Sequence, residues 1–321
     1  MRYVALFVAL ALPQAAWPQQ DAQVWLNKMT RAVRSLNYEG TFVFMHGGAV
    51  DAMHIIHEHD EGGVRERLIS LTGETREFIR NKGVLTCVWP GKHSVVVEKT
   101  RSQHGIPATL PADTEGLYKY YRFQTAGKDR IAGKSCRIIA IKPKDDLRYG
   151  HRLCIAEDSG MLLKSVMLNA AGTPIEEVMF TSLNLLKNIP NRRFKSTMIN
   201  DDVWQRAAIQ STPLELKADP GWRIQMMPSG FKVTANTKRI IAADPTPVQH
   251  IILTDGLASV SVFIARLRSR KALFEGTTNS GALNAFARDL NNYQITVVGE
   301  VPEETVEMIG KSIAYRPNEA H

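Results

Sequence analysis

Short apolar segments separated by glycine turns fill residues 35–99, and this alternation limits what the chain can fold into. Val, Ile, Phe and Thr make up the segments, and a turn signal interrupts them at a spacing of roughly ten residues. The turns are His46-Gly47-Gly48, Glu61-Gly62-Gly63, Thr72-Gly73-Glu74, Lys82-Gly83 and Pro90-Gly91. This spacing is typical of an antiparallel meander, in which consecutive strands pair with each other. We therefore expect a curved sheet with one buried face.

The expected strands of this meander also carry charged side chains. Six of them lie in two neighbouring segments: Arg65, Glu66, Arg67, Arg76, Glu77 and Arg80. Charged residues in strands favour a solvated face or a sheet edge, so we expect these six to contact water. The sheet is then half-buried, unlike the central sheet of a parallel α/β fold. The sequence contains no glycine-rich fingerprint for a dinucleotide or a phosphate group.

A second meander is predicted between residues 120 and 187. Its strands are expected at 120–126, 135–142, 149–157, 161–169 and 174–187, with turns at Gly127-Lys128-Asp129, Asp158-Ser159-Gly160 and Ala171-Gly172-Thr173. A helix capped by Asp21 precedes both meanders, because Ala22, Leu26, Met29, Val33 and Leu36 recur at helical spacing. Asp113 is expected to begin a short second helix. About ten or eleven strands with so few helices predict a large open barrel.

The remaining chain is predicted to hold a connection and a second, smaller domain. Residues 188–220 lack periodicity and contain three prolines, with a short helix over 203–210 as one option. Beyond them we expect a hairpin over 222–239, two strands turning at Asp255-Gly256, a strand or short helix over 282–290, a strand over 293–301 and a helix opened by Pro302. The predicted class is α+β: a large N-terminal half-open antiparallel β-barrel with helices, plus a smaller C-terminal α+β domain.

The first twenty residues read as a secretory signal peptide. One basic residue precedes an apolar run from Tyr3 to Leu12, and small residues follow at Ala15 and Ala16. The run is too short to cross a bilayer. We therefore divide the chain into a signal peptide at 1–20, a first domain at 21–190, a linker at 191–220 and a second domain at 221–321. The signal predicts an exported, soluble protein of the periplasm.

The formal net charge of +8 is spread along the chain rather than gathered in a block. Binding to nucleic acid needs a concentrated basic stripe and a recognisable motif, and neither is present in the sequence. No nucleic-acid partner is therefore expected. A mildly basic protein is suited to anionic lipid or to an acidic partner.

Three cysteines, at positions 87, 136 and 154, allow one disulfide in an exported protein. Residues 136–143 and 149–156 are predicted to be neighbouring strands. Pairing them about Asp145 places Cys136 directly opposite Cys154, where the Cβ atoms of cross-strand neighbours are about 4.5–5.5 Å apart. The alternative is that both remain buried free thiols, as Cys87 is expected to be in its apolar strand.

Histidines are the most suggestive candidates for chemistry. His57 and His59 are two residues apart, so they share one face of a strand, whereas His54 points to the other face. A metal site would need a third ligand from a neighbouring strand, and a polar strand face is the favoured interpretation. The sequence contains no nucleophile elbow and no zinc-protease motif. We expect a protein that is not an enzyme and has no catalytic residues, metal or cofactor.

Binding is therefore the expected activity. A strongly curved sheet has a concave apolar face, which one or two helices cover only in part and which can form a groove for a lipid, an acyl chain or a peptide. The candidate groove residues are Phe42, Phe44, Ile55, Leu68, Leu85 and Trp89. The alternative is that the protein's own side chains fill the groove completely.

Several stretches resemble the RseB/MucB family of periplasmic sigma-factor regulators. The resemblance rests on NYEGTFVF, on HIIHEHDEGGVRERLISLTGETREFIR and on RIAGKSCRIIAIKPKDDLRYGHRL, and it continues into the second domain through WRIQMMPSGF and TDGLASVSVFI. RERLISLTG is its most specific piece. It covers nearly all of the chain after the signal, in the expected order.

The resemblance implies a first domain like the lipoprotein carriers LolA and LolB, with helices across the mouth of its half-open barrel. Members of the family bind the periplasmic domain of an RseA/MucA-like anti-sigma factor and shield it from site-1 proteolysis. Lipoprotein or lipopolysaccharide acyl chains are the implied releasing signals. The second domain then binds the partner.

Two functions remain open at this point. A lipid or lipoprotein carrier would use the same half-barrel groove for transport, whereas a regulator uses it for sensing. The second domain, of about a hundred residues, favours the regulator, because a carrier needs only the open barrel. An exported metalloenzyme is the remote alternative, and the sequence leaves a homo-oligomer open.

Overall fold

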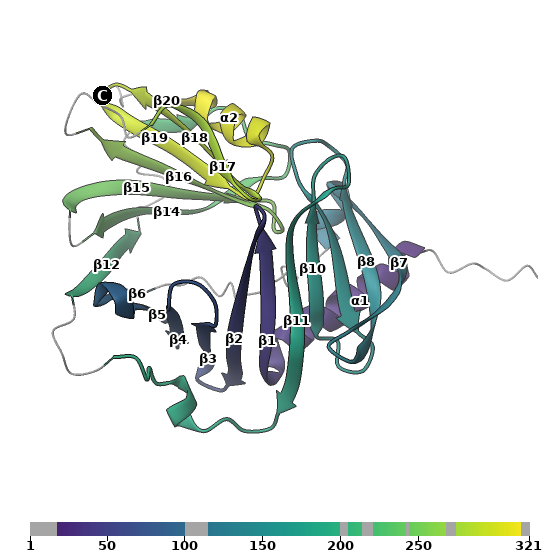
Figure 1. Cartoon of the computed structure of the whole chain (residues 1–321). Coiled ribbons are helices and arrows are strands. Elements are labelled where there is room, and N and C mark those ends of the chain that lie inside the picture. The colour runs from purple at the N-terminus through teal and green to yellow at the C-terminus, as the bar shows by residue number, and fades with distance from the viewer. Residues whose placement is uncertain are drawn as a thin grey trace, which may run out of the picture.

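The computed structural model describes residues 18–99, 115–199, 205–213, 221–241, 244–267 and 274–315. Eleven of its strands lie in residues 37–186 and form one antiparallel sheet (Figure 1). They are β1 (Asn37–His46), β2 (Ala49–Asp60), β3 (Gly63–Ser70), β4 (Glu77–Asn81), β5 (Val84–Trp89), β6 (Ser94–Lys99), β7 (Tyr121–Ile131), β8 (Lys134–Pro143), β9 (Gly150–Ala156), β10 (Leu162–Leu168) and β11 (Pro174–Leu186). The expected strand number is confirmed.

The strand order of this sheet is β6-β5-β4-β3-β2-β1-β11-β10-β9-β8-β7. Both meanders run in sequence order, and β1 joins them by pairing with β11. In the described structure β6 pairs with β5 and β12, and β7 pairs with β8, so β6 and β7 do not close this sheet on itself and the barrel is half-open. The predicted fold class is confirmed. No helix in the described part of the chain is long and apolar enough to cross a membrane.

The turn predicted at Gly127-Lys128-Asp129 is wrong. Strand β7 continues to Ile131, and the chain turns at Ala132-Gly133 instead. The pairing of β7 with β8 shifts between Thr125 and Lys128, which is the mark of a β-bulge. Gly127 supplies the positive φ of +116° at this irregularity, so the glycine that suggested a turn serves a bulge.

Helix α1 (Pro18–Ser35) covers one side of the sheet, and its apolar stripe is buried as predicted. Leu26 and Met29 pack with side chains from β7–β10, such as Phe123 and Ile139. The helix begins before Asp21, which lies in the first turn rather than at the cap. The 3-10 helix η2 (Glu115–Lys119) precedes β7. The expected helix start at residue 113 and residues 1–17 of the expected signal peptide lie outside the described residues.

Residues 188–220 are more than a connection. The 3-10 helix η3 (Asn191–Phe194) packs on the sheet, where Phe194 and Ile189 bury Ile56 of β2. A strand, β12 (Gln205–Pro213), follows, so the option of a short helix over 203–210 is wrong. It runs parallel to β6 and antiparallel to β14 (Lys232–Ile241). One ladder of hydrogen bonds therefore continues from the first meander into the second sheet (Figure 1).

The C-terminal residues form a second sheet with its own core. Its strands are β14, β15 (Asp244–Thr254), β16 (Ser259–Arg266), β17 (Gly276–Ser280), β18 (Leu283–Leu290) and β19 (Tyr293–Gly299), in the order β14-β15-β16-β19-β18-β17. Helix α2 (Glu303–Ser312) buries Val306 and Ile309 against this sheet, as predicted. Residues 282–290, for which a strand and a short helix were both open, form the strand β18.

The hairpin predicted over 222–239 is wrong. Strand β13 (Trp222–Ile224) pairs with β20 (Ile313–Tyr315) at the other end of the domain, not with β14. A turn does form at Pro228, whose carbonyl accepts a hydrogen bond from the amide of Phe231 at 3.1 Å. The ring of Trp222 packs on Tyr315 and on Tyr293, so aromatic burial holds β13 at the distant strand.

Candidate ligand face and domain junction

The six candidate groove residues share one face of the first meander. Side chains directly opposite each other in paired strands lie on the same side of a sheet, and so do residues two apart within a strand. Ile55 lies opposite Leu68, and Phe42 lies opposite Met53. The same rule carries this face across β4 to Leu85 and Trp89 of β5. Phe44 follows Phe42 by two residues, and we name this surface the apolar face.

The apolar face is covered at one end and partly uncovered at the other. Phe42, Ile55 and Leu68 are only 1%, 1% and 5% exposed, and they belong to a cluster that includes Ala32 of α1. Phe44, Leu85 and Trp89 are half-buried. The protein's own side chains therefore fill the part next to α1, and the other three residues are the part of the apolar face that stays partly exposed.

A row of polar side chains crosses the same face. Glu66 Oε1 is 3.0 Å from His57 Nδ1, and Glu66 Oε2 is 3.3 Å from Arg80 Nε. The His57 ring stacks on Tyr38 with 4.8 Å between the ring centres. Burial, with Glu66 as a smaller contribution, raises the pKa of the Tyr38 hydroxyl. Arg80 lies opposite Leu85, so the Glu66–Arg80 ion pair, whose side chains are 12% and 16% exposed, lies beside the half-buried apolar residues.

The other two histidines of the candidate cluster have different surroundings. His54 lies on the opposite face, where its Nε2 is 3.1 Å from Glu39 Oε1. His59 follows His57 by two residues in the regular register of β2 and so shares its face, as predicted, but its side chain is exposed near the end of the strand. In the described residues no three His, Cys, Asp or Glu side chains are grouped so that they could hold a metal ion. The structure therefore does not bring the histidines together.

The expectation that the strand charges contact water is wrong for several of them. Arg67 is 6% exposed and Glu77 is fully buried, and the two form an ion pair. They lie on the side opposite the apolar face, beneath residues 193–197. Arg67 Nη2 donates to Thr197 Oγ1 at 2.9 Å, and Ser196 Oγ donates to Glu77. Residues 193–197, which are distant in the sequence, thus supply the hydrogen bonds to Arg67 and Glu77 that water was expected to supply.

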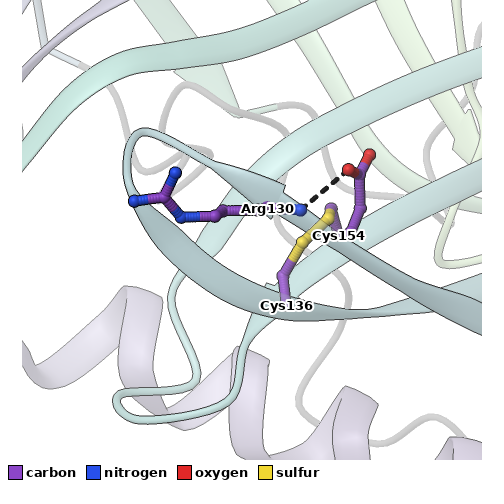
Figure 2. The surroundings of a disulfide bond; sticks show 4 residues. Arg130, Cys136 and Cys154 are labelled. Atoms are coloured by element: carbon purple, nitrogen blue, oxygen red, sulfur yellow. Dashed lines mark hydrogen bonds between the residues drawn. A yellow bond between two sulfur atoms is a disulfide. The ribbon is translucent and has the colours of Figure 1, made fainter.

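Cys136 and Cys154 form a disulfide, with 5.5 Å between their Cα atoms (Figure 2). Cys87 is the free cysteine. This Cα separation is ordinary for a disulfide. The predicted register is wrong, however. Cys136 lies opposite Ala156, and Cys154 lies opposite Ile138, so the bond joins diagonal positions. The chain between the two strands turns one residue position later than the prediction about Asp145.

The two sheets also meet at a polar junction that the sequence did not indicate. Arg148, in the loop between β8 and β9, has a fully buried side chain. Its Nε is 2.7 Å from Asp255 Oδ2, in the turn between β15 and β16. The hydroxyl of Tyr121 donates to the same carboxylate oxygen at 2.8 Å. Arg148 and Asp255 are 107 residues apart in the chain, and no local pattern connects them.

Two family models match the chain in succession. Residues 21–198 match the MucB/RseB N-terminal domain, and residues 216–314 match the MucB/RseB C-terminal domain. The chain belongs to the MucB/RseB family. The resemblance found in the sequence is thereby confirmed.

Two curated bacterial relatives cover nearly all of the chain. The sigma factor AlgU regulatory protein MucB of Pseudomonas aeruginosa is 31% identical, with 100% of this chain and 99% of the relative covered. The sigma-E factor regulatory protein RseB of Haemophilus influenzae is 26% identical, with 98% of each covered. These names describe regulators rather than enzymes, which confirms the expectation that this MucB/RseB protein is not an enzyme.

Solved MucB structures share the fold. MucB in complex with MucA(peri) is 29% identical with a TM-score of 0.69, and it covers 94% of this chain and 100% of that one. The MucA/MucB complex of Pseudomonas aeruginosa is 30% identical with a TM-score of 0.70 and the same coverage. The arrangement described above is therefore that of a MucB-type protein.

Proposed function

We propose that this protein is a periplasmic regulator that binds the periplasmic segment of a membrane anti-sigma factor and shields it from site-1 proteolysis. The observation that carries the proposal is the match to MucB–MucA complexes along nearly the whole chain, at a TM-score of about 0.7 in both cases. A partner of the MucA type is therefore the expected ligand. Binding and regulation need no catalytic group.

The architecture supports the proposed shielding mechanism. Two sheet domains linked through residues 191–220 present a long surface on which an extended segment can lie. A partner segment that is disordered when free must become ordered on binding, which costs several kcal/mol and keeps the complex releasable. The protein then hides the cleavage site by covering the substrate, and the protease itself stays active.

A reconstituted digestion tests the shielding. The periplasmic segment of the anti-sigma factor is incubated with its site-1 protease, with and without this protein. The protein is expected to slow cleavage of the segment in proportion to the fraction bound, and to leave hydrolysis of an unrelated short peptide by the same protease unchanged. Equal inhibition of both substrates would show that the protease is the target and would exclude covering.

The releasing signal is proposed to be an acyl chain of a lipoprotein or lipopolysaccharide, bound at the apolar face. Phe44, Leu85 and Trp89 support this, because they are the half-buried part of a face whose remainder is core. Burial of an acyl chain contributes about 0.8 kcal/mol per methylene group. By linkage, a lipid that lowers the affinity for the anti-sigma segment has its own affinity lowered equally by that segment.

Lipid binding is tested with a triacylated lipopeptide in a thermal melt of the full protein. We expect the lipopeptide to raise the melting temperature, and Leu85→Asp to abolish that rise, since it places a charge on the apolar face. Val50→Asp is the matched control, because Val50 is 59% exposed and its alternation in β2 places it on the opposite face. A rise that survives Leu85→Asp would place the lipid elsewhere.

A lipid carrier remains the second candidate function, and the same half-buried apolar residues favour it. A carrier must hand its cargo to an acceptor membrane, whereas a regulator needs only reversible binding. Transfer of a fluorescent acyl chain between vesicles distinguishes the two. We expect no acceleration of transfer by this protein.

A further inference from the structure

Arg148 is buried where the loop between β8 and β9 meets the C-terminal domain. Its guanidinium pairs with Asp145 of the same loop and with Asp255 of the β15–β16 turn. It also donates to the backbone carbonyl of Ser229, in the turn before β14. One cation thus joins three segments, of which two belong to the C-terminal sheet.

Aromatic rings enclose the same guanidinium. The central carbon of the guanidinium, Cζ, lies 5.0 Å from the ring centre of Tyr120, 5.7 Å from that of Tyr121 and 5.3 Å from that of Phe231. Tyr120 and Tyr121 belong to the N-terminal domain, whereas Phe231 belongs to the C-terminal domain. A cation between rings gains from their negative faces, and the effect grows when water is excluded.

Asp255 is satisfied from both sides of the junction. Its Oδ2 accepts from Arg148 and from Tyr121, while its Oδ1 accepts from the amides of Leu257 and Ala258 at 2.9 and 2.8 Å. The carboxylate is therefore held both by its own turn and by the N-terminal domain. A buried carboxylate that lost its cation would be left with an expensive uncompensated charge.

Two neutral hydrogen bonds flank this centre. Asn284 Nδ2 donates to the hydroxyl of Tyr149 at 2.8 Å, and Thr305 Oγ1 donates to the carbonyl of Leu147 at 3.0 Å. Both come from the C-terminal domain, and both reach the residues on either side of Arg148. The loop is therefore held at three consecutive positions.

We propose that Arg148 and Asp255 form a latch that fixes the C-terminal domain in one orientation on the N-terminal domain. The latch closes because the Arg148 and Asp255 side chains are both fully buried, and across the junction each is the charged partner of the other. Breaking the pair leaves the two cores intact, since neither residue belongs to a strand of either sheet. The orientation of the two domains in the free protein then becomes variable. This inference concerns the free protein and does not depend on the proposed partner.

The latch is tested in the full protein by small-angle X-ray scattering and hydrogen–deuterium exchange. Arg148→Met keeps much of the apolar stem and removes the charge. We expect a larger maximum dimension in solution, and faster amide exchange at 145–149 and 255–258. Loss of a hydrogen-bonded charge pair corresponds to an increase of at least about tenfold at these amides. Amides of β1–β3 and of β16–β19 should keep their protection.

The matched control is Arg152→Met, because Arg152 lies in the adjoining strand β9 with an exposed side chain. It should change neither measurement. If Arg148→Met lowers protection throughout, the double variant Arg148→Met/Asp255→Leu decides, since it removes both charges and leaves none buried alone. That variant should recover the protection of the two cores and still open the junction. A junction that remains compact and protected in a folded variant lacking the pair would overturn the latch.

Discussion

At the scale of single residues, buried charges hold the first meander to residues 193–197, which follow the second meander. Glu77 is fully buried, forms an ion pair with Arg67 and accepts a hydrogen bond from Ser196. Removing one partner of a buried ion pair typically costs about 3–5 kcal/mol, because the other charge remains in a poor solvent. We expect Glu77→Ala to lower the free energy of unfolding by roughly that amount in a urea titration.

Glu74→Ala is the control for this prediction. Glu74 is paired with Lys92 on the surface, where the side chains are 48% and 65% exposed, so its loss should cost less than about 0.5 kcal/mol. Replacing both members, as in Arg67→Met/Glu77→Leu, should cost less than Glu77→Ala alone. Equal effects of Glu77→Ala and Glu74→Ala would show that burial of the pair has no energetic consequence.

The disulfide between Cys136 and Cys154 closes a loop with a sequence separation of 18 residues. A loop of this length contributes on the order of 3 kcal/mol by restricting the unfolded chain. Peptide mapping of the exported, unreduced protein should find the 136–154 link and a free thiol at Cys87. Cys136→Ser/Cys154→Ser should lower the denaturation midpoint, and Cys87→Ser should not lower it comparably. Three alkylatable thiols in the native protein would exclude the bond.

His151, which is near the latch, makes the free energy of unfolding depend on pH. Desolvation lowers the pKa of its ring from 6.5 to about 4, and the nearby carboxylate of Asp255 opposes this only in part. The folded state therefore binds fewer protons than the unfolded state between these pH values. Stability is complete above pH 6.5 and falls as the pH drops toward 4, by up to about 3 kcal/mol.

Comparison of the protein with His151→Gln isolates this contribution from that of the carboxylates. The difference in unfolding free energy between the two should shrink by about that amount from pH 7 to pH 4, because Gln does not titrate. The measurement is urea unfolding at several pH values. A constant difference across this range would show that His151 keeps an ordinary pKa when folded.

At the scale of elements, β12 decides whether the two sheets are connected by a ladder. Ile209 lies opposite Glu98 of β6 and opposite Ile241 of β14, so a neighbouring strand is present on either side of its backbone. Proline there removes the amide hydrogen and does not fit a central strand. We expect Ile209→Pro to raise amide exchange in β6 and β14, whereas Ile209→Val, which keeps the amide, should not. Unchanged exchange would mean that β12 contributes no lasting ladder.

At the scale of the whole molecule, the C-terminal domain has a core of its own. All buried members of that core lie between Trp222 and Ile313, and none comes from the N-terminal sheet. We expect residues 216–321 alone to unfold cooperatively on heating and to retain much of the binding of the anti-sigma segment. Circular dichroism and isothermal titration test the two parts. A folded fragment with no binding would place the partner on the N-terminal domain.

The sequence by itself determined the local elements, because strand length, apolar alternation and glycine turns are properties of neighbouring residues. The eleven strands of the first sheet, the apolar stripe of α1 and the shared face of Phe42 and Ile55 all follow from such periodicity. The resemblance to the MucB/RseB family came from the particular amino-acid sequences of the same segments. None of this needed contacts between distant parts of the chain.

Tertiary structure alone decided which polar groups are buried and which strands meet. From the sequence, Glu77 is expected to be a solvated charge, but residues 193–197 cover it in the folded protein. Likewise, β13 is expected to form half of a hairpin, but Trp222 packs on the rings of Tyr293 and Tyr315 instead. Arg148 is an ordinary loop cation until Asp255 meets it from 107 residues away. The physical reason is that the cost of burying a charge depends on the partner that reaches it, and only the folded chain brings that partner near.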